Sequence, residues 1–86
     1  MCTYQTERVP VAGSGKGASG WFPVTSATVY FDHPVHAPAT HTLNVDFINP
    51  EQGPSARVAV ELDPESARAL AEAILLTLAS AGAELS

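Results

Sequence analysis

Three histidines lie within a short segment of the chain, D-H-P-V-H-A-P-A-T-H, at His33, His36 and His41. Imidazole nitrogen binds Zn²⁺ and Cu²⁺ well, and three converging imidazoles leave a fourth coordination position open. Histidine also titrates near neutral pH, so a member of this cluster is a candidate general base. The cluster is therefore the first place in the sequence where chemistry is expected.

The spacing H-x2-H-x4-H matches no standard metal motif, and polar turn residues give the same pattern. Three interpretations of His33, His36 and His41 stay open at this point. They are turn or partly buried residues without a metal, a zinc or copper site, or the general base of a small enzyme. We favour the first, which makes the chain not evidently catalytic.

Two other features resemble reactive sites and fail simple tests. The segment G-S-G-K-G at residues 13–17 suggests a phosphate loop, but Gly17 stands where the motif needs Ser or Thr. Cys2 has no basic neighbour in the sequence to lower the pKa of its thiol. We therefore expect a flexible glycine-rich loop over residues 11–20, with Trp21 and Phe22 anchoring its end on the core.

Three segments alternate apolar and polar side chains with a period of two, which is typical of half-buried strands. They span residues 24–33, 41–48 and 56–62, and residues 3–9 have the composition of a fourth strand. Short connections rich in Pro and Gly join the three clear strands, so antiparallel neighbours are expected. The pattern predicts a three- to four-stranded meander.

A helix is predicted over residues 64–81. Asp63 is a suitable N-cap, Pro64 fits the first helical position, and Glu65 complements the helix dipole. Apolar residues then recur at the spacing of one helix face, which we name the helix stripe: Ala67, Leu70, Ala71, Ile74, Leu75 and Leu78. Leu76 lies outside the stripe and is either an isolated exposed leucine or part of a subunit contact.

Matching the apolar faces of the strands predicts the register. Ala27 is expected opposite Phe47, with His33 opposite His41 at the end of the same pair of strands. In the next pair Phe47 is expected opposite Ala56, and Asp46 opposite Arg57 on the polar face. The strand that enters the helix would then bring Asp63 close to the paired histidines.

Size and charge restrict the function further. The 86 residues suffice for one domain, and 1–86 is predicted to be a single α+β domain with the helix packed on one face of the sheet. Four basic residues against nine acidic ones argue against nucleic-acid binding. We expect no signal peptide, because the N-terminal residues have neither a basic start nor an apolar run, and no stretch approaches the roughly 18 apolar residues of a membrane helix. We expect a cytoplasmic protein.

Several motifs resemble those of a family of small uncharacterised actinobacterial proteins. They are the opening M-C-T-Y, the segment G-S-G-K-G followed by G-W, the run Y-F-D-H-P and the strand H-T-L-N-V-D-F. The resemblance covers nearly the whole chain. It implies a bacterial cytoplasmic protein, and it implies no activity, cofactor or catalytic residue.

Small domains without disulfides often gain stability from a partner subunit, and Cys2 is the only cysteine here. We therefore expect a self-associating binding or accessory domain of unknown ligand. The polar face of the sheet is the expected contact surface, with Tyr30 and Ile48 as its apolar anchors. The alternatives are a metal-binding protein that uses His33, His36 and His41, and a small enzyme with a histidine general base.

Overall fold

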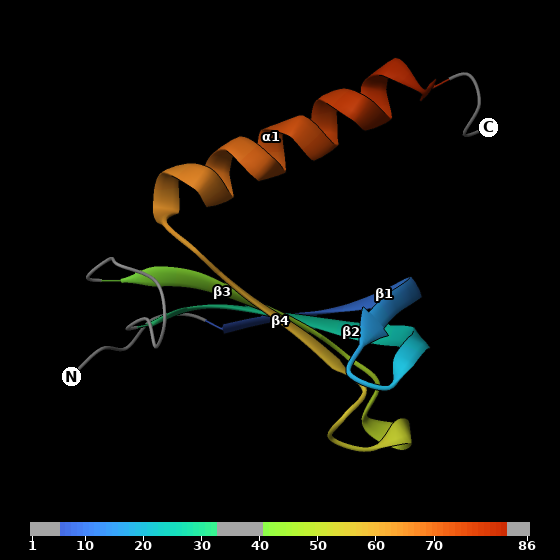
Figure 1. Cartoon of the computed structure of the whole chain (residues 1–86). Helices are drawn as coiled ribbons and strands as arrows, with labels where there is room; N and C mark the ends of the chain where they lie inside the picture. Colours follow the sequence, from blue (N-terminus) through green and yellow to red (C-terminus); the bar gives the residue numbers. More distant parts are fainter. Residues whose placement is uncertain (1–5, 33–40, 83–86) are drawn as a thin grey trace.

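The computed structural model describes residues 6–32 and 41–82. These residues form a four-stranded antiparallel sheet in the order β1-β2-β3-β4, followed by one helix, α1 (Figure 1). The elements are β1 (Thr6–Gly17), β2 (Gly20–Asp32), β3 (Thr42–Ile48), the 3-10 turn η1 (Pro50–Gln52), β4 (Arg57–Leu62) and α1 (Pro64–Ser80). The predicted α+β class, the meander and the C-terminal helix are confirmed.

The register of β2 against β3 agrees with the prediction. Ala27 lies opposite Phe47 and Phe31 opposite Leu43. Both strands alternate apolar and polar side chains along their length, and only this register keeps both apolar sets on one face. The next predicted pair is His33 with His41. Because His33 lies outside the described residues, this pairing stays a prediction.

The predicted register of β3 against β4 is wrong by two residues. Phe47 lies opposite Val58 instead of Ala56. Ala56 closes the hairpin, where its carbonyl accepts the backbone N–H of Asn49 at 3.1 Å, and the Asn49 side chain caps η1 by accepting the N–H of Glu51 at 3.2 Å. A slip of two residues leaves every side chain on its predicted face, so alternation alone does not detect it.

The predicted glycine-rich loop over 11–20 is also wrong. β1 continues to Gly17, and the turn consists of Ala18 and Ser19 alone. A Cβ at Gly15 would lie 3.0 Å from Cγ2 of Val24, and a Cβ at Gly17 would lie 3.3 Å from the carbonyl oxygen of Ser55. These glycines are needed because other parts of the chain pack closely against the strand, and a glycine inside a strand often marks such an approach.

A bulge bends the first hairpin around a small core. The register of β1 against β2 shifts between Pro10 and Gly13, so two residues of β1 stand opposite one residue of β2. The end of β1 thereby comes close to the start of β4, where Gly17 faces Ser55. The core enclosed at this end consists of Phe22, Val24 and Ala56, with Val11 and Val58 packed against it.

We expect Gly15→Ala to destabilise the fold by about 1–3 kcal/mol, because the new methyl group overpacks the core against buried Val24. Gly13→Ala is the matched control, since a Cβ at Gly13 meets nothing within 4 Å and its φ is not positive. Its expected effect is neutral or stabilising by up to about 1 kcal/mol. Urea unfolding measures both, and equal midpoints would show that close packing does not select the glycine.

α1 begins at Pro64, as predicted. The Asp63 side chain caps it by accepting the backbone N–H of Ser66 at 2.7 Å. Hydrogen bonds from the side chain and the backbone N–H of Ser66 hold the pKa of Asp63 below its ordinary value of 3.8, because they favour the charged carboxylate.

The lowered pKa makes helix stability depend on pH in one direction. The stabilisation is complete above the ordinary pKa of 3.8 and is lost as the pH falls through the lower folded-state pKa of Asp63. Asp63→Asn keeps a capping oxygen that does not titrate in this range. The stability advantage of the natural chain over Asp63→Asn should therefore be constant near neutrality and shrink below pH 3.8 in circular dichroism melts. A difference that does not change with pH would contradict this role.

The predicted packing of the helix on one face of its own sheet is not found. Only the first turn lies against the sheet, where Pro64, Ala67 and Arg68 share a shallow hollow with Phe31 and Leu43. No residue of α1, all of which is described, is buried, and the helix runs over the sheet at a distance (Figure 1).

The cause is the junction between strand and helix. β4 ends at Leu62 and α1 starts at Pro64, so Asp63 alone connects them. Asp63 has extended backbone angles, φ −67° and ψ 159°, as expected before a proline. No loop is present that could turn the helix down onto the sheet.

Candidate functional site

α1 carries five of the nine large apolar side chains that are exposed among the described residues. Its large apolar side chains are exposed by about half or more: Leu70 51%, Ile74 52%, Leu75 67%, Leu76 69% and Leu78 48%. Single exposed leucines are common on protein surfaces, but a contiguous set of this size marks an interaction site.

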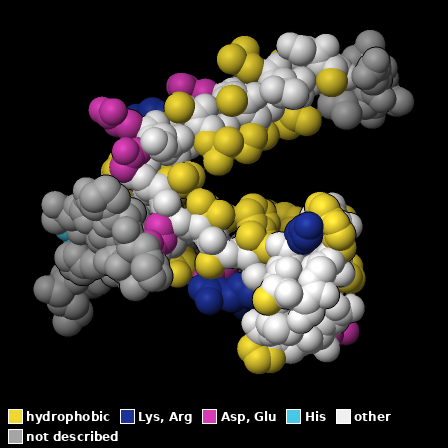
Figure 2. Space-filling view, in the orientation of Figure 1, with side chains coloured by type: hydrophobic (Ala, Val, Ile, Leu, Met, Phe, Trp, Pro, Cys, Tyr) yellow, Lys and Arg dark blue, Asp and Glu magenta, His cyan; other side chains and the backbone are white. Residues whose placement is uncertain are grey.

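The sheet offers a second apolar surface on the side of the helix, which we name the inner face. By the observed register it consists of the following residues: Ala27, Val29, Phe31, Leu43, Val45, Phe47, Val58, Val60 and Leu62. Phe47 and Val60 are 38% and 36% exposed. Figure 2 shows apolar side chains on the lower side of the helix and the upper side of the sheet, with open space between them, which we name the trough.

A hollow deepens the inner face at the end of the first hairpin. It has a volume of about 390 Å³ and is lined mainly by apolar side chains, among them Val11, Val24, Phe47 and Val58. Trp21 and Lys16, which are opposite one another in the hairpin, also line it. Trp21 is 71% exposed and Phe22 is buried. The expectation that both residues anchor on the core is thus right for Phe22 and wrong for Trp21.

The size of the molecule agrees with an uncovered surface. Its radius of gyration is 14.5 Å, whereas a compact domain of this length has about 12 Å. Its accessible surface is 6372 Å², about 1,500 Å² more than expected for a compact monomer of this mass. A standard interface buries roughly 800 Å² on each partner, so the excess is large enough for a stable one.

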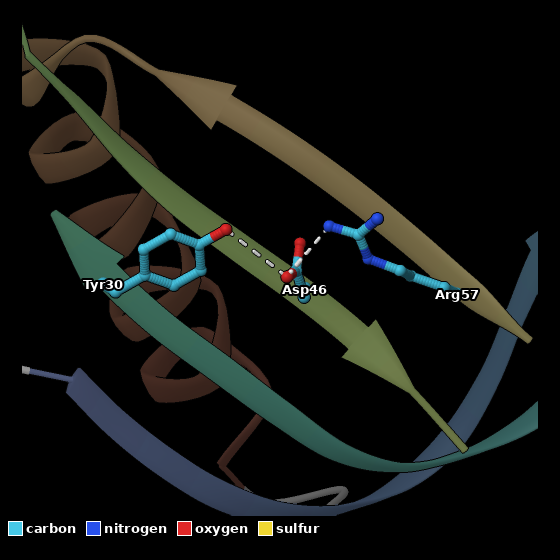
Figure 3. Close-up of polar contacts among 3 residues, drawn as sticks. All are labelled: Tyr30, Asp46 and Arg57. Carbon is cyan, nitrogen blue, oxygen red and sulfur yellow. Dashed lines mark hydrogen bonds and ion pairs between the residues drawn. The ribbon is translucent and has the colours of Figure 1, made fainter. Parts of the chain in front are cut away.

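The outer face of the sheet, in contrast, is polar and internally bonded. Asp46 accepts a hydrogen bond from the Tyr30 hydroxyl at 3.5 Å and pairs with the Arg57 guanidinium at 3.1 Å (Figure 3). The predicted contact of Asp46 with Arg57 is therefore present, although it runs diagonally because Asp46 stands opposite Ala59.

Other side chains of the outer face bond in the same way. Arg8 donates to the Ser26 hydroxyl at 3.1 Å, and buried Thr42 donates to the amide oxygen of Asn44 at 2.7 Å. Within residues 6–32 and 41–82, no buried side-chain nitrogen or oxygen lacks a hydrogen-bond partner. The outer face, which the sequence suggested as the contact surface, offers far less apolar area than the trough.

Two members of the histidine cluster, His33 and His36, lie outside the described residues, and so does Cys2. His41 is the described member of the cluster. His41 is half-buried, and its ring stacks on Phe31 with centroids 5.7 Å apart and an angle of 10° between the rings. Phe31 and Pro64 line the same shallow hollow, so His41 lies near the corner where the helix starts, as expected. Among the described residues, no group of three His, Cys, Asp or Glu is placed to hold a metal ion. The zinc or copper site at His33, His36 and His41 stays a prediction.

One family model matches residues 1–86 of the chain, and its description is a family of unknown function, DUF6295. The chain belongs to the DUF6295 family. No curated protein and no solved structure matches it. Membership agrees with the resemblance to an uncharacterised family and carries no activity with it. An actinobacterial origin stays a prediction.

The described part of this DUF6295 chain contains no helix long and apolar enough to cross a membrane. The trough was not predicted, although the sequence contains two signals for it. The single residue between Leu62 and Pro64 leaves no loop for the helix to fold back. In addition, the eight residues 73–80, A-I-L-L-T-L-A-S, include no charged side chain on any side of the helix.

Proposed function

We propose that this DUF6295 domain is a self-associating binding module whose chains pair through the trough, that is, through the helix stripe and the inner face. The observation that carries the proposal is the helix held over an apolar sheet face with its leucines 48–69% exposed. A soluble monomer rarely leaves so large an apolar surface in water.

The energetic reason is the small size of the chain. A domain of this length buries too little surface to be more than marginally stable alone. Completing the burial of five half-exposed Leu and Ile side chains would add on the order of 5 kcal/mol per chain. Association supplies this stabilisation by mass action.

The expected cytoplasmic location is consistent with the same mechanism. Reducing conditions there disfavour disulfides, and a single cysteine cannot form one within the chain. Subunit contacts are then the available source of additional stability. The proposal assigns no reaction to the domain, and the ligand or partner that the paired module serves is left open.

Trp21, the single tryptophan, provides the test because it lines the hollow on the inner face and is 71% exposed in one chain. In the associated form its indole should be buried, so its emission should lie at short wavelength. Dilution should shift the emission to longer wavelength as the mass from sedimentation falls. Emission typical of a water-exposed indole at every concentration, with a monomer mass, would refute the proposal.

A further inference from the structure

The second half of α1 is apolar on all sides. The charged residues of the helix, Glu65, Arg68 and Glu72, all lie in its first nine residues. Leu76 is two residues from both Ile74 and Leu78, which places it about 200° around the helix from each. It is 69% exposed. The Thr77 hydroxyl is turned to the backbone, where it donates to the carbonyl of Ala73 at 2.8 Å.

A helix that is apolar on every side is normally covered on every side. The chain's own sheet could cover at most one side of α1, the side of the helix stripe. The junction at Asp63 prevents even that contact beyond the first turn. Two separate layers must therefore cover the helix, and neither comes from the described residues of the same chain.

The helix and the sheet that line the trough have similar lengths. α1 has 17 residues and β3 has 7, which correspond to lengths of about 25 Å and about 23 Å. The helix stripe and the inner face contain no charged residue. The charged residues that border the trough are Lys16 at the hollow of the first hairpin and Arg68 at the first turn of α1. The uncharged lining gives no electrostatic selection for a charged foreign partner, and it suits an uncharged helix. Residues 73–80 of the chain's own α1 form an uncharged helical segment of this kind.

We propose that the trough is occupied by α1 of a second copy, so that two chains interlock. This inference rests on the proposed self-association and specifies its geometry. With two-fold symmetry, each α1 lies between the partner's α1 and the partner's sheet. The two helix stripes then face each other, and in residues 73–80, which carry no charge, the side with Leu76 packs on the partner's inner face. Glu65, Arg68 and Glu72 lie in the first half of α1, outside this contact. The layers are sheet, helix, helix and sheet.

This arrangement also distinguishes between the two interpretations of Leu76. If the helices paired only through their stripes, Leu76 would stay exposed as an isolated surface leucine. If the chains interlock, Leu76 is buried in the interface. The excess of about 1,500 Å² over a compact monomer is more than the roughly 800 Å² that a standard interface buries on each chain.

The test compares the solution mass of the natural chain with those of Leu76→Glu and Gln52→Glu. Gln52 is exposed on η1, far from α1 in sequence, and serves as the matched addition of one negative charge. We expect a dimer for the natural chain and for Gln52→Glu, and an at least 100-fold weaker dimer for Leu76→Glu. A full-strength Leu76→Glu dimer would overturn the interlocking while leaving self-association intact. A monomeric natural chain would overturn both.

Cross-linking keeps the inference testable if Leu76→Glu fails to fold. In a Cys2→Ser background, cysteines placed singly at Leu70, Ile74 and Leu78 sample the length of the helix stripe. Interlocked chains bring the stripes together, so at least one of these positions should form a disulfide between chains under mild oxidation. Leu76→Cys, which faces the partner's sheet, should not. Dimers that give no disulfide from any stripe position would overturn the proposal.

Discussion

Replacing Leu78 by glutamate is expected to weaken the dimer by at least 100-fold. Leu78 is 48% exposed in the single chain and belongs to the helix stripe, where the partner would bury it. A carboxylate buried without a partner costs several kcal/mol, and about 2.7 kcal/mol is enough for a 100-fold change in Kd. Sedimentation at several concentrations measures the change.

Leu78→Met is the matched control, because it keeps an apolar side chain of similar volume and should cost less than about 1.5 kcal/mol. Both variants should keep the strand signal in circular dichroism, since Leu78 makes no buried contact within its own chain. A Leu78→Glu variant that dimerises as strongly as Leu78→Met would show that the helix stripe is not part of the interface.

Lengthening the junction between β4 and α1 is expected to weaken the dimer strongly, because the helix stripe can then pack within its own chain and only the side with Leu76 stays uncovered. Five Gly and Ser residues inserted between Leu62 and Asp63 would free the helix from the extended, proline-restricted geometry of Asp63. The helix stripe could then cover the inner face of its own sheet. Short connections favour exchange of elements between chains, and longer ones allow closure within a chain.

Light scattering should give a lower mass for this insertion than for the natural chain at the same concentration. Small-angle scattering of its monomer should give a radius of gyration near the roughly 12 Å of a compact domain. The same five residues placed between Ala18 and Ser19, in the exposed turn of the first hairpin, form the control. They add equal flexibility without freeing the helix, so the control should remain a dimer. Retention of the dimer by both insertions would contradict the role of the junction.

The sequence predicts the strands and helix well where the pattern is local. Alternation in β2 and β3 is strong on both faces, and it gave the correct partner for Ala27, Val29 and Phe31. The register of β4 was missed by two residues because alternation is unchanged by an even slip. The deciding contact is the closure of the hairpin by Asn49 and Ala56.

Contacts distant in sequence account for the remaining errors. Gly15 and Gly17 suggest a loop, and only the approach of Val24 and of β4 shows why a strand needs glycine there. The amphipathic pattern of α1 correctly indicates that it must be covered, but the pattern does not say which chain covers it. Periodicity therefore predicted a helix on its own sheet, although the one-residue junction forbids this packing.

The polar residues were predicted with mixed success for the same reason. Asp46 and Arg57 are on one face by alternation, and they do pair. His41 lies in space near the first turn of α1, as expected. Its described ring contact, however, is with Phe31, an apolar residue of the inner face. The contact surface was expected on the outer face of the sheet. There the polar side chains instead form hydrogen bonds and an ion pair with one another.

The central claim is that the trough is filled by a second copy of the chain, and the solution mass tests it most directly. Sedimentation equilibrium of the complete, untagged chain at micromolar concentration should give twice the chain mass of 9.0 kDa. A mass of 9.0 kDa throughout the concentration range would contradict the account.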